Sequence, residues 1–183
     1  MKVVIVGLGT ASFSAMLAIK KINRTVDITV IDKKSFDLQH SCGLPYALEG
    51  KVDLKSLEHS IGADKMNIKI LSECEVVKID KKNKEIEYVS LKDKSNSKLS
   101  YDRLLLDTGS EPFLPPINGL KDNKNIFTVK NSSDVNAIKK KVKQSKTAVV
   151  IGAGAIGLEI AYALKKKGLK VTIIEALSCL FPR

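Results

Sequence analysis

One cysteine of this 183-residue chain stands where a reactive thiol would be expected. Cys42 comes just before a short stretch with helical features, within the sequence His40-Ser-Cys-Gly-Leu-Pro-Tyr-Ala-Leu-Glu-Gly50. Pro45 suits the first turn of a helix and Gly50 suits its end. A thiol at the start of a helix meets oriented N–H groups, which favour the thiolate. Cys42 is therefore a candidate redox sulfur, and the alternative is an inert buried thiol.

A strand–turn–helix–strand pattern opens the chain. Residues 2–6 have the composition of a buried parallel strand, apolar periodicity predicts a helix from Phe13 to Ile22, and residues 27–31 form a second predicted strand. The glycine-rich turn Gly7-Leu-Gly-Thr-Ala-Ser12 lies between the first strand and the helix. This order of elements is typical of a βαβ unit that binds a dinucleotide.

Each part of this unit has a task in dinucleotide binding. Gly7 permits the tight turn, and Gly9 lets the backbone approach a pyrophosphate at the helix N-terminus. Asp32 follows the second strand and can accept hydrogen bonds from an adenosine ribose. Ser12 stands where the pattern has its third glycine, so its side chain is expected to loosen the packing of helix on strand.

The same order returns near the end of the chain. Strands predicted at 147–151 and 170–174 flank the turn Gly152-Ala-Gly-Ala-Ile-Gly157 and a predicted helix from Leu158 to Lys167, and Glu175 follows. An acid at this position bonds a free 2′-hydroxyl and repels a 2′-phosphate, which favours NADH over NADPH. A single fingerprint can arise by chance, whereas two complete units hardly can. The doubled pattern therefore predicts two dinucleotide sites.

Predicted strands of another kind lie between the two units. Ile68 to Ile79 and Lys84 to Leu91 alternate like strands, and Leu99 to Leu106 form another after the polar turn Lys92–Lys98. The fold class expected is α/β, with two Rossmann-like βαβ units. The first carries an inserted antiparallel β-meander and the second is truncated.

The domain boundaries follow from proline and serine positions. Three prolines, Pro112, Pro115 and Pro116, make a stiff connector, and Ser132 or Ser133 can cap a helix that runs to about Lys143. We expect a first dinucleotide domain at residues 1–112, a linker at 113–131 and the start of a second domain at 132–183.

Composition argues against several classes of protein. The net charge of +11 comes from lysines spread over nearly every segment, without interleaved aromatics or a nucleic-acid motif, so a solvated surface is expected and no nucleic acid. No apolar run approaches the roughly 20 residues of a membrane span, and no secretory leader is visible. The three cysteines form no CxxC pair, which argues against a metal site and fits a reducing cytoplasm.

These motifs resemble the N-terminal part of the pyridine nucleotide–disulfide oxidoreductases, in the branch with a single redox cysteine. That branch includes coenzyme A-disulfide reductases, NADH oxidases and NADH peroxidases. Ala47 stands where the other branch has a second cysteine, so no internal disulfide can form. The matching segments, in the family's order, are the first glycine turn, Cys42-Gly-Leu-Pro-Tyr46, Tyr101-Asp-Arg-Leu-Leu-Leu106 with Thr108-Gly109, and the second glycine turn.

The resemblance implies that the first unit holds FAD, that the second holds NADH, with NADPH less favoured, and that the Cys42 sulfur lies against the flavin. Cys42 would cycle between thiolate and mixed disulfide, or between thiolate and sulfenic acid. The positions that match FAD contacts are Gly7, Gly9, Thr10, Ala11, Ser12, Asp32, Lys33, Cys42, Val76, Thr108 and Gly109. Those that match NAD contacts are Gly152, Gly154, Ile156, Gly157, Glu159 and Glu175.

The expected electron acceptor is a low-molecular-weight disulfide such as coenzyme A disulfide or polysulfide. In the peroxidases and many oxidases of this branch, a histidine in the first glycine turn assists peroxide or oxygen chemistry, and Thr10 occupies that position here. His40 is expected at the surface. The alternatives are an NADH oxidase or peroxidase acting through Cys42 sulfenic acid, and a non-catalytic FAD-binding subunit. The substrate positions implied by the resemblance are Ser14, Lys21 and Ser41.

Further expectations concern departures from the family. Asp107 replaces a small residue and places a carboxylate near the expected FAD site, at a cost in flavin affinity unless Arg103 or a lysine compensates. Cys74 and Cys179 are expected to be structural.

Only the family's N-terminal part is recognisable, so a homodimer or a chain supplying the C-terminal half is expected to cover apolar residues of the second unit. These residues are Ile151, Ile156, Ile160, Ile173 and Ile174.

Overall fold

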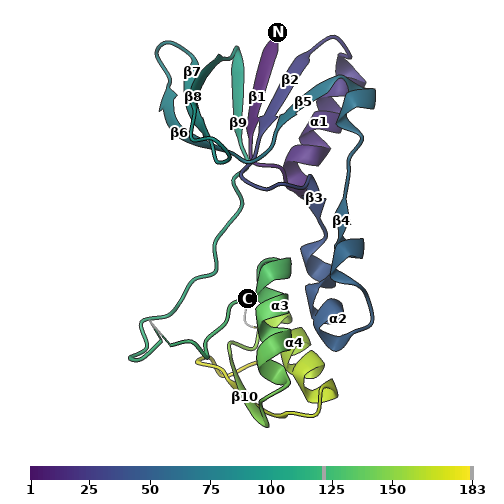
Figure 1. Ribbon diagram of the computed structural model, residues 1–183, viewed down its shortest axis with the longest axis vertical. Helices are drawn as coiled ribbons and strands as arrows, with labels where there is room; N and C mark the ends of the chain where they lie inside the picture. The colour runs from purple at the N-terminus through teal and green to yellow at the C-terminus, as the bar shows by residue number, and fades with distance from the viewer. Residues whose placement is uncertain (121–122, 182–183) are drawn as a thin grey trace. The chain divides into compact units, whose positions relative to one another are not determined.

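The computed structural model describes residues 1–120 and 123–181 (Figure 1). Residues 121–122 of the predicted linker and residues 182–183 of the predicted second domain lie outside the described residues. The chain divides into two compact units. Unit 1 comprises Met1–Gln39 and Glu58–Ser110, and unit 2 comprises His40–Leu57 and Glu111–Arg183.

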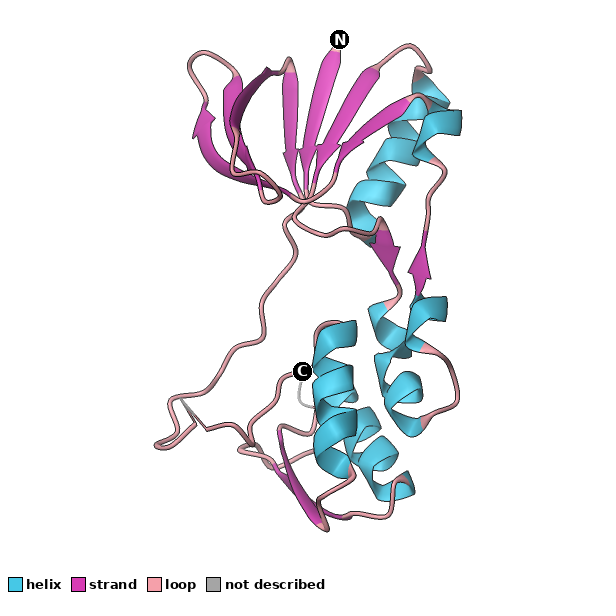
Figure 2. Cartoon of the chain, in the orientation of Figure 1, coloured by secondary structure: helices cyan, strands magenta, loops and turns pink. Residues whose placement is uncertain are grey.

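A four-stranded parallel sheet with one main helix forms the centre of unit 1 (Figures 1 and 2). Its strands follow the order β5-β2-β1-β9, and each neighbouring pair is parallel. The first two predicted strands are confirmed residue by residue. The elements are β1 (Lys2–Val6), α1 (Thr10–Ile22), β2 (Asp27–Ile31), β5 (Ile68–Leu71) and β9 (Arg103–Leu106).

The buried face of α1 consists of Ser12, Met16 and Lys20, which are spaced four residues apart along the helix. Met16 is fully buried in a cluster with the apolar residues of β1 and β2. Lys20 is buried too, and its ammonium group donates to the carbonyl oxygen of Val26 at 2.8 Å and of Asn67 at 3.1 Å. These contacts hold the C-terminal end of α1 beside the residues that precede β2 and β5.

The predicted strand from Ile68 to Ile79 is wrong as a single element. It consists of β5 and of β6 (Cys74–Asp80), which belong to different sheets. The break falls at Glu73, whose φ is +54° and whose N–H donates to the carbonyl oxygen of Lys34 at 3.0 Å. An alternating pattern cannot reveal such a turn, because both halves alternate equally well.

The inserted meander is a three-stranded antiparallel sheet of β6, β7 (Glu85–Ser90) and β8 (Asn96–Ser100). The predicted strand from Leu99 to Leu106 is likewise two strands, because β8 closes the meander and β9 joins the parallel sheet. Two short elements, β3 (Leu38–Gln39) and β4 (Glu58–His59), pair antiparallel, and a 3₁₀ helix, η3 (Ala63–Met66), precedes β5.

Unit 2 contains the second βαβ pattern and two further α-helices (Figure 1). The predicted strands are confirmed and pair in parallel. The cap of α3 is Asn131 rather than Ser132 or Ser133, because the Asn131 side chain accepts the N–H of Asp134 at 3.1 Å. The elements are η1 (Ser41–Gly43), α2 (Leu44–Glu49), η2 (Leu54–Leu57), α3 (Ser132–Val142), β10 (Thr147–Ile151), α4 (Ala155–Lys166) and β11 (Lys170–Ile174).

The core of unit 2 explains why residues 40–57 cluster with it rather than with the segment 1–39 that precedes them. Leu44, Ala47 and Leu48 of α2 are almost fully buried against apolar side chains of α3 and α4. Ile160 lies in this core, so its expected exposure is wrong. The other expected apolar residues, Ile151, Ile156, Ile173 and Ile174, are exposed as predicted. Among the residues that the structure describes, no helix is both long and apolar enough to cross a membrane.

Candidate functional site

The first glycine turn lies at the carboxyl ends of β1, β2 and β9, which meet at one edge of the parallel sheet. Gly7 has φ of +98°, and its N–H donates to the carbonyl oxygen of Ile31 at 2.8 Å. A Cβ on Gly7 would lie 2.0 Å from the carbonyl oxygen of Asp107. The turn therefore requires glycine at this position, both for its backbone conformation and for the close approach of β9.

The backbone N–H groups of this turn bind oxygens of the chain itself. The Leu8 N–H donates to Oδ2 of Asp32 at 2.5 Å, and the Gly9 N–H donates to Oγ of Ser12 at 2.7 Å. The Ser12 N–H donates to Oδ2 of Asp107. Ser12 is fully buried, and its hydroxyl also donates to the carbonyl oxygen of Gly9 at 2.9 Å, so it holds the turn rather than loosening the packing as expected.

Asp32 organises the turn together with a lysine that the sequence reasoning missed. The Lys34 ammonium donates to Oδ2 of Asp32 at 2.9 Å and to the carbonyl oxygen of Leu8 at 2.7 Å. The predicted Lys33 is exposed and reaches Glu75 at 3.4 Å instead. The position of Lys34 in the sequence could have indicated this contact. Lys34 follows Asp32 by two residues, and there an Asx-type hydrogen bond folds the chain back.

The remaining positions predicted for FAD take up different surroundings. Thr10 and Ala11 are exposed at the start of α1, where the first N–H groups have no partner within the helix. Thr108 and Gly109 are exposed after β9, and Gly109 has φ of +71°. The Val76 side chain is part of β6 and packs against a core cluster.

The geometry of the turn fits the pyrophosphate of a dinucleotide. A Cβ built on Gly9 meets nothing within 4 Å, so the backbone there faces open space. The N–H groups of Thr10 and Ala11 begin a 13-residue helix, whose N-terminus attracts anions. Both features are those that a phosphate needs for close contact with the backbone.

The second glycine turn repeats the arrangement of the first. Gly152 has φ of +99°, and its N–H donates to the carbonyl oxygen of Ile174 at 2.8 Å. The Ala153 N–H donates to Oε2 of Glu175 at 2.7 Å, as the Leu8 N–H does to Asp32. In each unit, the acid after the second strand thus holds the middle residue of its own Gly-x-Gly turn.

Glu175 is held in its charged form. Its carboxylate accepts the N–H of Ala153 and, at 2.9 Å, the N–H of Leu177. These hydrogen bonds lower the pKa of Glu175 below its usual value, chiefly through the Ala153 N–H. Glu175 is therefore an anion at neutral pH, beside a turn that could receive a nucleotide.

The other second-turn positions lie on α4 or before it. A Cβ on Gly157 would lie 2.1 Å from the carbonyl oxygen of Gly152, so the third glycine permits helix and turn to touch. A Cβ on Gly154 would meet nothing within 4 Å. Ile156 and Glu159 are exposed on α4. The second turn therefore also offers an open approach to its backbone.

Cys42 lies in unit 2, in the short 3₁₀ helix η1, and is exposed. The predicted helix after it is confirmed as α2, with Pro45 in the first turn and Gly50 closing it at φ of +94°. The helix has only six residues, so its dipole is small. The predicted position of the sulfur against a flavin stays a prediction, since the first glycine turn belongs to unit 1.

The other cysteines and the histidine differ in exposure. Cys74 is partly buried at the start of β6, and burial raises the pKa of its thiol, which suits an inert structural residue. Cys179 is exposed after β11. His40 is exposed, as expected.

The predicted substrate positions divide between the units. Ser14 and Lys21 are both exposed on α1, two turns apart, so they share one helix face. The Ser14 hydroxyl donates to the carbonyl oxygen of Thr10 at 2.9 Å. Ser41 is exposed in unit 2, beside Cys42. Neither unit therefore contains all three of these residues.

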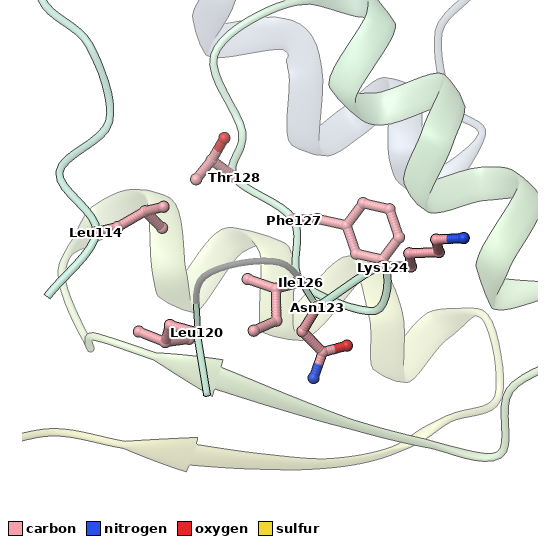
Figure 3. Close-up of a pocket in the computed structure, with 7 residues that line it drawn as sticks. All are labelled: Leu114, Leu120, Asn123, Lys124, Ile126, Phe127 and Thr128. Atoms are coloured by element: carbon pink, nitrogen blue, oxygen red, sulfur yellow. The ribbon is translucent and has the colours of Figure 1, made fainter. Parts of the chain in front are cut away.

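An open hollow of about 550 Å³ lies in unit 2, along the connector before α3 (Figure 3). It is mostly apolar and contains none of the residues predicted for a site. Its lining residues are Leu114, Leu120, Asn123, Lys124, Ile126, Phe127 and Thr128. Within residues 1–120 and 123–181, no cluster of three or more His, Cys, Asp or Glu side chains could hold a metal ion.

Two alanine substitutions separate the structural task of the first turn from its binding task. Gly7→Ala should destabilise the chain by about 3 kcal/mol, because its φ is unsuited to alanine and its Cβ would overlap Asp107. Gly9→Ala should leave stability nearly unchanged and weaken dinucleotide binding at least about fivefold, because its Cβ enters open space where a phosphate would lie.

Urea denaturation and titration with FAD measure the two effects. Equal stability losses in both variants would contradict this division of tasks.

Comparison with known proteins relates the whole chain to one oxidoreductase family. Residues 1–183 match the family model described as pyridine nucleotide-disulphide oxidoreductase. An NADH oxidase of Methanocaldococcus jannaschii is 39% identical and is matched over 100% of this chain and 42% of its own length. A coenzyme A disulfide reductase of Staphylococcus haemolyticus is 29% identical, over 95% of this chain and 40% of its own length.

A solved structure shares the fold of the whole described chain. The water-forming NADH oxidase from Lactobacillus brevis, bound to NADH, superposes with a TM-score of 0.90 at 31% identity. The match covers 100% of this chain and 41% of that protein. The chain thus spans about two fifths of the length of the proteins it matches.

Proposed function

The chain belongs to the pyridine nucleotide-disulphide oxidoreductase family, and on that premise we propose that it is the N-terminal portion of an FAD-dependent NADH:disulfide reductase. The observation that carries this proposal is the repeated turn geometry. Asp32 and Glu175 each hold the middle N–H of a Gly-x-Gly turn, and a helix begins directly behind each turn with N–H groups that have no partner within the helix. Two such turns suit one site for FAD and one for NADH.

Residues of unit 1 would hold FAD. Thr10 and Ala11 would donate N–H groups to its pyrophosphate, and Asp32 would accept from the ribose after releasing part of its contact with Leu8 or Lys34. When bound, FAD carries two electrons from the nicotinamide to sulfur. In unit 2 the N-terminus of α4 would hold the NADH pyrophosphate, and Glu175 would bond the free 2′-hydroxyl.

Cys42 would carry the disulfide chemistry. Its thiolate attacks one sulfur of a disulfide RSSR, forms the bond Cys42–S–S–R and releases RS⁻, which takes a proton from solvent. Two electrons that originate from NADH then cleave this mixed disulfide, release the second RS⁻ and restore the thiolate. The sum is NADH, H⁺ and RSSR giving NAD⁺ and two RSH. The exposure of Cys42 supports this role, because an attacking thiolate must be accessible.

The proposed substrate is coenzyme A disulfide or a polysulfide. The similarity to a coenzyme A disulfide reductase supports this class. Lys21 is exposed on α1 and could pair with a phosphate, and Ser14 lies on the same face. Ser41, next to Cys42, would contact the substrate near its sulfur.

The second candidate function is an NADH oxidase that reduces oxygen or peroxide through Cys42 sulfenic acid. The similarity to two NADH oxidases favours it. Thr10 speaks against it, because that position in the turn lacks the histidine expected for oxygen or peroxide chemistry. A non-catalytic FAD-binding subunit would instead bind flavin without turnover.

The proposed partners are small molecules and a further polypeptide segment. In unit 2, Ile151, Ile156, Ile173 and Ile174 are 50%, 60%, 39% and 54% exposed. Covering such residues stabilises a protein by about 25 cal/mol per Å² of apolar surface. We propose that the whole protein covers them with the rest of the second nucleotide domain, supplied by its own chain or another, or in a homodimer. The proposed location is a reducing cytoplasm.

An anaerobic assay tests the function directly. With oxygen excluded, the flavin-loaded whole enzyme should oxidise NADH in the presence of coenzyme A disulfide and release two thiols for each NADH consumed. The flavin extracted by heat should be FAD, because Asp32 serves an adenosine ribose that FMN lacks. NADH consumption that requires oxygen would favour the oxidase, and extracted FMN would contradict the FAD site.

A further inference from the structure

Asp107 places a negative charge at the N-terminus of α1. It follows β9 directly, and its backbone N–H donates to the carbonyl oxygen of Val6 at 2.8 Å, which fixes it beside Gly7. Its Oδ2 accepts the N–H of Ser12, in the first turn of α1. The carboxylate is therefore held against the helix end that would receive the dinucleotide pyrophosphate.

No cation in the described part of the chain neutralises this carboxylate. Arg103, the expected compensating residue, donates to the carbonyl oxygen of Asp102 at 3.0 Å. Lys34 pairs with Asp32. Among the ion pairs within residues 1–120 and 123–181, none includes Asp107.

The carboxylate and a pyrophosphate act on the same helix end. A carboxylate at the first turn stabilises a helix because it complements the partial positive charge and satisfies an N–H group. The same charge repels a second anion placed a few ångströms away. Asp107 thus stabilises the empty turn and opposes the filled one.

We propose that Asp107 is an internal anion that competes with the dinucleotide pyrophosphate for the N-terminus of α1. It lowers the affinity of unit 1 for FAD and strengthens the nucleotide-free fold. This inference rests on the proposed FAD site. Its consequence is that a higher FAD concentration is needed to fill the site, because the Asp107 carboxylate already supplies negative charge at the helix end where the phosphate would bind.

Two variants and a matched control test the proposal in the full chain. Asp107→Asn keeps an oxygen that can accept the Ser12 N–H but removes the charge, so the FAD dissociation constant should fall about tenfold. Asp107→Ala should also bind FAD more tightly, and its FAD-free form should melt at a lower temperature. Asp102→Asn is the control, because Asp102 accepts the Lys2 N–H at 2.6 Å beside the opposite end of β9.

Flavin fluorescence measures the dissociation constants, and thermal unfolding without FAD measures stability. Tighter FAD binding in both Asp107 variants, with Asp102→Asn like the wild type, supports the proposal. Wild-type affinity in Asp107→Asn would overturn it while leaving the FAD site intact. If neither the wild type nor the variants bound FAD, the FAD assignment itself would fail, and this inference with it.

Discussion

Changing Cys42 to serine should abolish disulfide turnover, with a fall in kcat of about a thousandfold or more, and leave the reduction of bound flavin by NADH at its original rate. Serine has nearly the volume of cysteine but lacks the soft nucleophile that attacks a disulfide. Cys42 is exposed in η1, and the neighbouring Leu44 and Pro45 provide the buried contacts. The substitution should therefore leave the fold of unit 2 unchanged.

The measurement separates the two half-reactions. Stopped-flow absorbance follows flavin reduction by NADH, and thiol release follows disulfide turnover. Cys179→Ser is the matched control, because Cys179 is also an exposed free thiol but lies after β11, outside the matching motif. Disulfide reduction at the original rate in Cys42→Ser, or its loss in Cys179→Ser, would show that another sulfur acts.

The sequence predicted best those elements whose signal is local. The strands β1, β2, β10 and β11 lie where expected, because each is a short run of mainly apolar residues that ends at glycine or an acid. The helices α1 and α4 begin three residues earlier than predicted, at Thr10 and Ala155. The first three residues of α1 are small or polar, and those of α4 contain one large apolar residue, Ile156, which is exposed, so neither set gives apolar periodicity.

The features that the sequence did not predict depend on tertiary contacts. The break at Glu73 assigns β5 and β6 to different sheets, although the residues alternate on both sides of it. Lys34 rather than Lys33 reaches the first turn, because the chain bends after Asp32. Asp107 was noticed as a departure, but its hydrogen bond to Ser12 spans 95 residues. No local pattern records such a pairing.

The nucleotide specificity should depend on the charge of Glu175. The wild-type enzyme should prefer NADH to NADPH by about tenfold or more in kcat/KM, because the anionic carboxylate repels a 2′-phosphate. Hydrogen bonds from Ala153 and Leu177 keep the pKa of Glu175 below its usual value, so the carboxylate is charged throughout the neutral range. The preference should therefore not vary with the protonation of Glu175 near neutral pH.

A series of substitutions isolates this charge from the shape of the turn. Glu175→Gln keeps an oxygen that can accept the Ala153 N–H, so the turn should persist while the KM for NADPH falls about tenfold. Ala176→Arg alone adds a cation but retains the carboxylate, and should have a smaller effect. The double variant removes the repulsion and adds an attraction, so it should prefer NADPH.

Steady-state kinetics with both nucleotides, at fixed disulfide concentration, measures the series. The KM for NADH should change less than about threefold in Glu175→Gln, because the side-chain oxygen still accepts from the 2′-hydroxyl. A loss of activity with both nucleotides would mean that Glu175 acts mainly by holding the turn. An unchanged ratio of kcat/KM values in the double variant would show that the 2′-position of the bound nucleotide lies away from this end of β11.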